Sequence, residues 1–152
     1  MKSYSSGYSD MEKQKLILIV GPTASGKTAA SIYAAIKLNG EIVSADSIQV
    51  YKGMDIGSAK PTMQERQGIP HHLMDAIDIN SPKFSVAEFR KMAGEAIEDI
   101  AGRGKQPIVV GGTGLYINSL VFPLNFTEVQ SDEKLRSELS QIEERRGRGT
   151  LH

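Results

Sequence analysis

The stretch Gly21-Pro22-Thr23-Ala24-Ser25-Gly26-Lys27-Thr28 directly follows the apolar run Leu16-Ile17-Leu18-Ile19-Val20 and decides the fold. It completes the pattern G-x-x-x-x-G-K-[ST], in which a glycine-rich loop joins a strand to a helix. Glycine lets the backbone curl so that successive N–H groups point into one concavity, and the helix N-terminus that follows favours the same anion. Lys27 adds a full positive charge, and the Thr28 hydroxyl suits Mg²⁺. The sequence therefore predicts a phosphate site formed by all eight residues, with Mg²⁺ as cofactor.

Length and composition narrow the class of protein. The 152 residues suffice for one domain, and 18 basic against 18 acidic residues give no overall charge that would favour nucleic acid. Any nucleic-acid contact must therefore be local. Cysteine is absent, which excludes disulfides and cysteine-bound zinc and agrees with a reducing cytoplasm. The longest apolar run is too short to cross a bilayer, so we expect no membrane span. We also expect a monomer located in the cytoplasm.

Strand and helix patterns predict an α/β fold, a parallel sheet with flanking helices of P-loop NTPase-like type that is incomplete at this chain length. The strand Leu16–Val20, a helix over Thr28–Leu38 and a strand over Glu41–Ala45 predict a βαβ unit. This unit brings Asp46 and the phosphate loop to one crevice if the two strands are neighbours. The dense apolar pattern of the helix indicates that it is covered on most sides.

The rest of the chain alternates between irregular and regular stretches. Residues 47–82 contain many glycines and prolines and are predicted to be irregular. The elements predicted after them are a helix over Ser85–Gly102 with a capping box, a strand over Pro107–Val110, a helix over Leu115–Leu120, and an amphipathic helix over Asp132–Arg146 with Leu135, Leu139 and Ile142 facing inward. We expect a flexible tail over 1–14, a P-loop catalytic core over 15–130 and the truncated start of a helical region over 131–152.

A phosphate loop alone favours a nucleotide or small-molecule kinase that binds ATP. Such enzymes usually hold Mg²⁺ with an acidic residue at the end of a second strand. Here the run Ile108-Val109-Val110 ends in glycine, and the carboxylate at a strand end is Asp46. The surroundings of Asp46 therefore decide between a kinase and another phosphate chemistry.

Several motifs, in order along the chain, closely resemble bacterial tRNA dimethylallyltransferase, the tRNA isopentenyltransferase or IPP transferase family. The likeness extends from the phosphate loop to about Arg136. It departs from the family pattern at Ser58, where threonine is more common, and in length, because family members continue into an arginine-rich segment that this sequence lacks. The motifs that carry it are Ala45-Asp46-Ser47-Ile48-Gln49-Val50-Tyr51, Gly53-Met54-Asp55-Ile56-Gly57-Ser58-Ala59-Lys60-Pro61, Pro70-His71-His72-Leu73 and Gly111-Gly112-Thr113-Gly114-Leu115-Tyr116.

The resemblance implies a reaction in which the dimethylallyl group of dimethylallyl diphosphate passes to N6 of the adenosine 3′ of the tRNA anticodon, with release of pyrophosphate. The phosphate loop would then hold the leaving diphosphate, with Thr23 near the bridging oxygen, Lys27 on the phosphates and Thr28 on Mg²⁺. Asp46 is the expected proton acceptor for N6, and the Gln49 amide can pair with an adenine edge. The expected tRNA-binding residues are Asp46, Ser47, Ile48, Gln49, Thr113 and Arg136.

Other interpretations of these residues remain open. The related adenylate isopentenyltransferases prenylate free nucleotides, a kinase would transfer phosphate, and a shortened chain could bind without turnover. Asp46 could merely cap the residues that follow it. His71 and His72 could suggest a metal, although adjacent side chains of an extended segment point in opposite directions and a structural role is favoured. Arg136 could belong to a solvated helix face.

Overall fold

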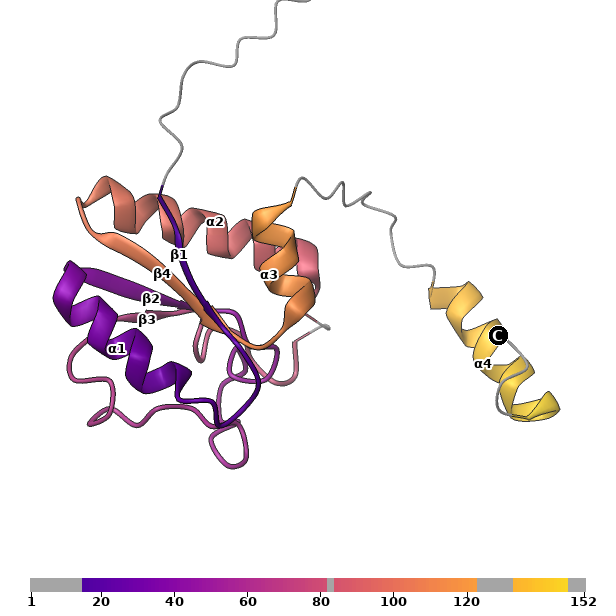
Figure 1. The fold of residues 1–152 in the computed structure, drawn as a ribbon. Coiled ribbons are helices and arrows are strands. Elements are labelled where there is room, and N and C mark those ends of the chain that lie inside the picture. Colours follow the sequence, from indigo (N-terminus) through magenta and orange to yellow (C-terminus); the bar gives the residue numbers. More distant parts are fainter. Residues whose placement is uncertain (1–14, 82–83, 123–132, 148–152) are drawn as a thin grey trace, which may run out of the picture.

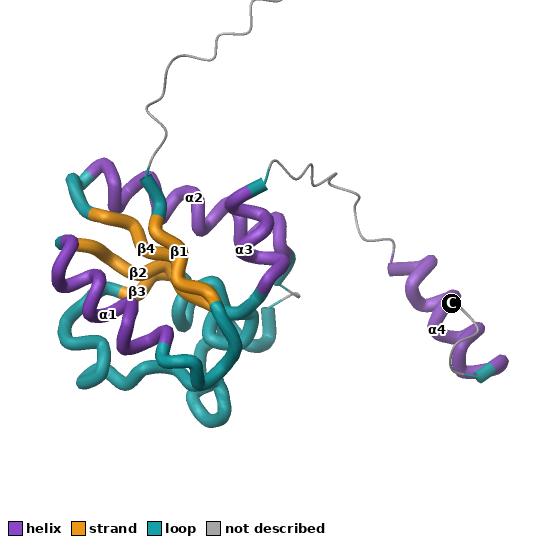
Figure 2. Tube along the Cα trace, in the orientation of Figure 1, coloured by secondary structure: helices purple, strands orange, loops and turns teal. Residues whose placement is uncertain are grey.

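The computed structural model describes residues 15–81, 84–122 and 133–147, which form helices and a four-stranded parallel sheet (Figures 1 and 2). The predicted tail over 1–14 lies outside these residues. Among the described residues, no helix combines the length and the apolar character that crossing a membrane requires. The elements are β1 (Ile17–Val20), α1 (Lys27–Leu38), β2 (Gly40–Ser44), β3 (His71–His72), α2 (Val86–Gly102), β4 (Gln106–Gly111), α3 (Gly114–Val121) and α4 (Glu133–Arg146).

The strand order of the sheet is β1-β4-β2-β3. Ile108 of β4 is in register with Ile17 of β1 on one side and with Ile42 of β2 on the other. The predicted βαβ unit of β1, α1 and β2 is present within one parallel sheet, but its two strands are not neighbours, because β4 lies between them. β4 takes the central place because its apolar residues are buried on both faces of the sheet, as Ile108 and Val109 are. The predicted crevice still forms, because all carboxyl ends of parallel strands lie at one edge.

Helices cover both faces of the sheet and divide the core in two (Figure 1). On one face, Ile32 and Ala35 of α1 pack against Ile42 and Ile108. On the other face, α2 and α3 pack against residues of β2 and β4 that point the opposite way, among them Val43 and Val109. Successive strand residues thus alternate between two apolar layers, which is the α/β arrangement predicted from the sequence.

Helix α1 is covered on one face only. Ser31, Ile32 and Ala35 are buried, whereas Tyr33 and Ile36 are 65% and 51% exposed. The prediction that this helix is covered on most sides is therefore wrong for the described residues. An apolar pattern shows that side chains avoid water but not what they contact, and here Tyr33 and Ile36 line a cavity.

The other predicted helices form with small differences. α2 begins after the N-cap Ser85, and the capping box with Glu88 is present, as predicted. α4 covers most of the range predicted for it, but Leu135, Leu139 and Ile142 are exposed. Their predicted inward orientation is therefore wrong in this structure. An amphipathic pattern places apolar side chains on one face of a helix, but it does not show that another apolar surface covers that face. Arg136 lies on α4, and its side chain is not among the described ones.

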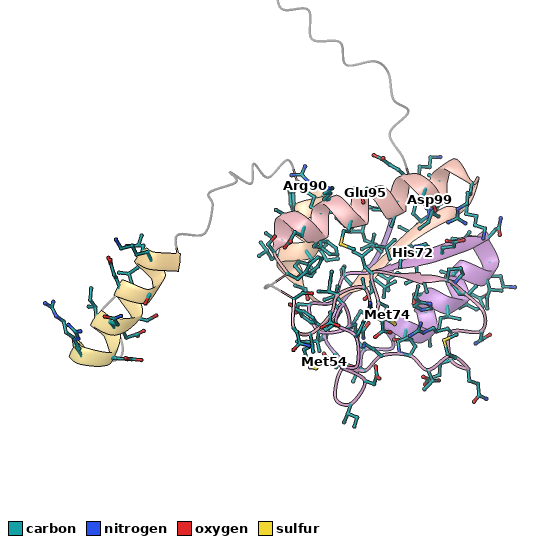
Figure 3. The ribbon with its side chains drawn as sticks, turned by 180° about the vertical axis from the view of Figure 1, so that it is seen from behind. Met54, His72, Met74, Arg90, Glu95 and Asp99 are labelled. Carbon is teal, nitrogen blue, oxygen red and sulfur yellow. The ribbon has the colours of Figure 1, made fainter. Side chains whose placement is uncertain are left out.

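A buried carboxylate joins the amino ends of the central strands. Glu41 of β2 accepts two hydrogen bonds from Arg103 at 2.6 and 2.7 Å, one from Lys105 at 2.6 Å and one from the His72 ring at 2.7 Å. Figure 3 views the molecule from behind and labels His72. The His71 ring contacts the Ile69 carbonyl oxygen at 2.8 Å. Both histidines thus have protein partners, which agrees with the structural role favoured from the sequence, and β3 is a short strand within a region predicted to be irregular.

Replacing Glu41 by glutamine is expected to lower the free energy of unfolding by about 3 kcal/mol at neutral pH, because three cationic or polar partners lose a buried anion. The hydrogen bonds from Arg103 lead the effects that hold the pKa of Glu41 well below its ordinary 4.5. A lowered folded-state pKa stabilises the protein above about pH 4.5, and this stabilisation is lost as the pH falls toward the folded value.

Urea unfolding at several pH values measures this difference. The gap between the parent chain and Glu41→Gln should shrink steadily below pH 4.5. Exposed Glu98→Gln is the matched control and should change little. A Glu41→Gln effect that does not depend on pH would contradict the assignment.

Candidate functional site

The loop between β1 and α1 has the conformation that its sequence pattern predicts. Gly26 is the N-cap of α1 with φ of 82°, and Ala24 also has a positive φ, 63°. No side chain caps the helix, so the N–H groups of its first turn have no side-chain acceptor from the cap residue. A helix start of this kind binds anions through its N–H groups and its positive dipole end.

Charged and hydroxyl groups accompany this helix start. The Lys27 ammonium donates a 2.5 Å hydrogen bond to the Pro22 carbonyl oxygen and so lies across the loop. Thr23, Ser25 and Thr28 line the adjoining cavity. Among the described residues, no three acidic, histidine or cysteine side chains gather as a metal cage. Thr28 lies at the start of α1 and lines the cavity, and its predicted contact with Mg²⁺ stays a prediction.

The loop after β2 presents Asp46 with its carboxylate oriented. Asp46 Oδ1 accepts hydrogen bonds from the Ile48 and Gln49 N–H groups at 2.8 and 3.2 Å. The capping role considered from the sequence is therefore real. Within the described part of the chain, Oδ2 makes no hydrogen bond, and Asp46 lines the cavity. One oxygen thus fixes the side chain while the other is left to act on a ligand.

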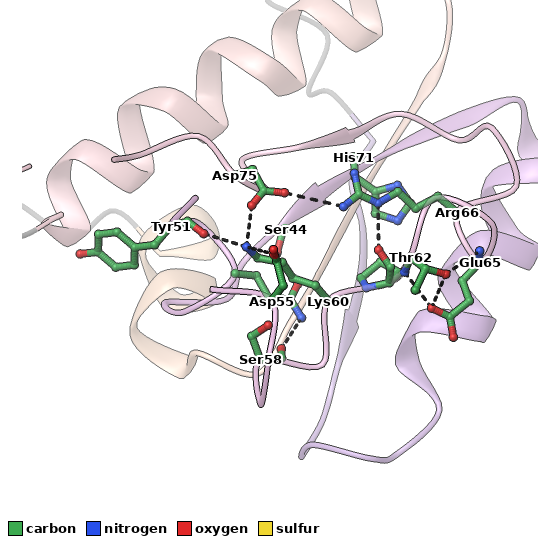
Figure 4. A network of polar contacts seen from close by, with 12 residues as sticks. Ser44, Tyr51, Asp55, Ser58, Lys60, Thr62, Glu65, Arg66, His71 and Asp75 are labelled. Atoms are coloured by element: carbon green, nitrogen blue, oxygen red, sulfur yellow. Dashed lines mark hydrogen bonds and ion pairs between the residues drawn. The ribbon is translucent and has the colours of Figure 1, made fainter. Parts of the chain in front are cut away.

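The side-chain amide of Gln49 already makes hydrogen bonds within the protein, which its predicted contact with adenine did not suggest. Its Oε1 accepts from the Ser44 hydroxyl at 3.2 Å, and its Nε2 donates to the carbonyl oxygens of Ser58 and Ala59 at 3.0 and 3.2 Å. Figure 4 labels two of these partners, Ser44 and Ser58. An adenine edge would have to replace some of these contacts. The predicted base contact of Gln49 therefore stays a prediction, and its structural role here is to hold residues 58 and 59.

Thr113 and Ser47 come together although they are distant in sequence. Thr113 Oγ1 accepts from the Ser47 N–H at 3.1 Å and donates to the Ser47 hydroxyl at 3.4 Å. This pair ties the loop after β4 to the loop that carries Asp46. Neither residue is part of the cavity lining, so their predicted contact with tRNA is untested and their observed contact is with each other.

One cavity of about 750 Å³, a size typical of small-molecule sites, is lined by residues 23–28 of the phosphate loop and by three of the predicted acceptor-side residues. Gly21 and Pro22 are not among its lining residues. The phosphate loop forms one end of it, and Asp46, Ile48 and Gln49 contribute from the loop after β2. The sequence did not indicate its remaining wall, which comes from α1 and from a region without periodicity. The lining residues that it missed include Tyr33, Ile36, Gly57, Ser58, Ala59, Glu65 and Gln67.

Glycine at the end of β4 allows the loops to meet. A Cβ placed on Gly111 would lie 2.2 Å from the Ala45 carbonyl oxygen, a backbone atom that cannot move aside cheaply. Gly111→Ala is therefore expected to lower the free energy of unfolding by about 2 to 3 kcal/mol, as overpacking does. Gly94→Ala in α2 is the control, because a Cβ there meets nothing within 4 Å. It should raise stability by about 0.5 to 1 kcal/mol, and equal effects in urea unfolding would contradict the packing argument.

Fold and site together define an α/β protein of P-loop NTPase-like fold. The model of the family described as IPP transferase matches residues 49–152. The chain therefore belongs to the IPP transferase family. It is 53% identical over 142 residues to the tRNA dimethylallyltransferase of Exiguobacterium sibiricum and 51% identical to that of Bacillus pumilus, covering 93% and 92% of this chain. It spans 45% and 44% of these relatives, less than half of their length.

Solved structures of relatives agree with this assignment. The tRNA delta(2)-isopentenylpyrophosphate transferase of Staphylococcus epidermidis is 52% identical with a TM-score of 0.71, and 87% of this chain aligns with 42% of it. The full-length tRNA isopentenylpyrophosphate transferase of Bacillus halodurans is 49% identical with a TM-score of 0.73, and 87% of this chain aligns with 43% of it. A eukaryotic dimethylallyltransferase acting on tRNA is 41% identical over 80% of this chain and 31% of its own, with a TM-score of 0.71.

Proposed function

We propose that this chain carries the catalytic half of a tRNA dimethylallyltransferase, which moves the dimethylallyl group of dimethylallyl diphosphate to N6 of the adenosine 3′ of the anticodon. The observation that carries the proposal is that the phosphate loop, Asp46 and Gln49 line one cavity. A donor diphosphate and an acceptor base can therefore meet there. The names of the relatives support the same reaction. We also propose that the protein is a monomer and that it lies in the cytoplasm, a reducing compartment with which the absence of cysteine agrees.

The diphosphate end of the reaction belongs to the phosphate loop. When the allylic C–O bond breaks, negative charge gathers on the bridging oxygen and on pyrophosphate. The N–H groups at the start of α1 and the Lys27 ammonium stabilise that charge more in the transition state than before it, and Thr23 lies on the same wall. Thr28 would hold Mg²⁺, which supplies further positive charge on the phosphate oxygens.

The acceptor end belongs to the loop after β2. The adenine must leave its stack to enter the cavity, and its N6 lone pair is delocalised into the ring. As the new C–N bond forms, N6 must lose a proton, and the unoccupied Oδ2 of Asp46 accepts it. The reaction balances: one C–O bond breaks, one C–N bond forms, pyrophosphate leaves and the proton passes to Asp46.

A kinase is the competing function for a loop of this type. The chain could bind ATP there, but β4 ends in Gly111 and lacks the acidic residue that usually accompanies Mg²⁺ in kinases. The adenylate isopentenyltransferase reaction differs only in its acceptor. The motifs in this chain do not separate it from the tRNA reaction, whereas the relatives favour tRNA.

The deciding experiment uses the extended chain, defined as this chain continued in frame with the downstream half of the Exiguobacterium sibiricum relative. It is incubated with Mg²⁺ and radiolabelled dimethylallyl diphosphate, together with either unmodified tRNA or adenosine monophosphate. Label transfer to tRNA is the expected result, and transfer to adenosine monophosphate would favour the adenylate isopentenyltransferase reaction. A parallel incubation with labelled ATP tests the kinase, and phosphate transfer without prenyl transfer would overturn the proposal. The chain alone should show little turnover.

A further inference from the structure

We propose that Lys60 is a positioning residue for the acceptor side of the cavity, acting through Gln49. The expected effect of Lys60 on catalysis rests on the proposed prenyl-transfer function. Its structural part stands independently, because it concerns contacts that can be observed without any reaction.

The Lys60 side chain is buried and fully engaged. It is 4% exposed, and its ammonium donates hydrogen bonds to the Tyr51 carbonyl oxygen at 2.7 Å and to the carboxylates of Asp55 and Asp75 at 3.1 and 2.5 Å (Figure 4). Three donors thus meet three acceptors from different segments. Burial lowers the pKa of Lys60, but the bonds to Asp75 and Asp55 raise it above its ordinary 10.5. The buried charge is therefore retained and compensated.

The segments that Lys60 contacts also hydrogen-bond to Gln49. The Asp75 N–H donates to the Gln49 carbonyl oxygen at 3.0 Å, so the segment paired with Lys60 also holds the Gln49 main chain. The Gln49 side-chain amide in turn donates to the carbonyl oxygens of Ser58 and Ala59, immediately before Lys60. Gln49 is thereby held at its backbone by Asp75, which pairs with Lys60 and, at 3.8 Å, with Arg66, and at its side chain by the two residues immediately before Lys60.

The segment held in this way would not keep its shape unaided. Ala59 has a φ of 52°, a left-handed conformation that costs a residue with a Cβ free energy and persists only where the surroundings enforce it. Without the Lys60 ammonium, Asp55 and the Tyr51 carbonyl oxygen would lose this donor, and Asp75 would keep only its longer contact to Arg66 at 3.8 Å. The residue next to Ala59 would then no longer be held in place. The carbonyl oxygens that receive the Gln49 amide would then move.

Gln49 is linked directly to the expected proton acceptor. Its N–H donates to Asp46 Oδ1, and both residues line the cavity. A displaced Gln49 therefore disturbs the orientation of the Asp46 carboxylate. Residues 23–28 of the phosphate loop line the same cavity, but within the described residues the loop makes no hydrogen bond or ion pair to Lys60. Loss of Lys60 should accordingly damage acceptor binding and chemistry while leaving diphosphate binding intact.

Lys60→Met tests this in ¹⁵N-labelled chain of residues 1–152, with Lys105→Met as the matched control. Lys105 also pairs with a buried carboxylate, Glu41 at 2.6 Å, but at the opposite end of the strands. Nuclear magnetic resonance follows the Gln49 side-chain amide, assigned with Gln49→Glu. In Lys60→Met its signals should shift and its hydrogen exchange should quicken about tenfold, the consequence of losing charge-assisted hydrogen bonds. Affinity for Mg²⁺ with pyrophosphate should stay within about twofold. Lys105→Met should leave the amide unchanged.

If Lys60→Met does not fold, Asp55→Asn provides the same test in weaker form, because it removes one partner whose side chain is 70% exposed. In the extended chain, Lys60→Met should raise KM for tRNA and lower kcat without raising KM for dimethylallyl diphosphate. An unshifted Gln49 amide in the folded variants would overturn the proposal even if prenyl transfer is found. A shifted amide in a chain without prenyl transfer would refute only the proposed function.

Discussion

Asp46→Asn is expected to slow prenyl transfer by the extended chain at least about a hundredfold, the usual contribution of a positioned general base. Asparagine keeps the side-chain length and an oxygen that can accept from the Ile48 and Gln49 N–H groups, so the turn after β2 should persist. It loses the carboxylate oxygen that would take the N6 proton. Single-turnover transfer from labelled dimethylallyl diphosphate to tRNA measures the rate of the chemical step.

The comparison with Asp46→Ala separates the two roles of this residue. Alanine removes both the cap and the base, whereas asparagine removes only the base. If capping were the whole contribution of Asp46, the asparagine variant would be as active as the parent and only the alanine variant would fail. Both variants should bind Mg²⁺ and pyrophosphate normally, since the phosphate loop is untouched. Full activity of Asp46→Asn would remove Asp46 as the proton acceptor.

The parts of the site that the sequence predicted are those determined by local chain geometry. The phosphate loop is continuous in sequence, with glycine at the N-cap of the helix it introduces, and Asp46 follows directly after a strand. In parallel sheets every strand end of this kind meets the same edge, so the shared cavity could be inferred without the strand order. The order itself could not, because hydrophobic periodicity does not show that β4 lies between β1 and β2.

The parts that were missed depend on contacts between irregular segments. Lys60, Asp75 and Gln49 are brought together by loops whose paths follow no helical or strand period. A lysine in such a loop is usually solvated, and only the structure shows this one buried between two carboxylates. The exposed side of α1 illustrates the same limit, because Tyr33 and Ile36 line a cavity while matching the pattern of core residues.

Replacing Lys27 by methionine is expected to weaken the binding of Mg²⁺ with pyrophosphate to this chain about 30- to 100-fold, the loss of a charge-assisted contact to a phosphate. Methionine keeps much of the apolar stem and removes the charge. In the free chain the ammonium lies against the Pro22 carbonyl oxygen, so it is already placed over the loop where the phosphates are expected. Isothermal titration calorimetry on residues 1–152 gives the affinity directly.

Lys37→Met is the matched control because it removes the same charge from the same helix. Lys37 lies in the last turn of α1, with its ammonium 5.7 Å from the Tyr33 ring centre, and it is not among the cavity residues. If net charge alone attracted pyrophosphate, the two variants would weaken binding equally and raised salt would abolish the difference from the parent. We expect Lys37→Met to stay within about twofold of the parent, because exposed charges distant from the ligand are screened. Equal losses would show that Gly21–Thr28 binds diphosphate without a specific contribution from its lysine.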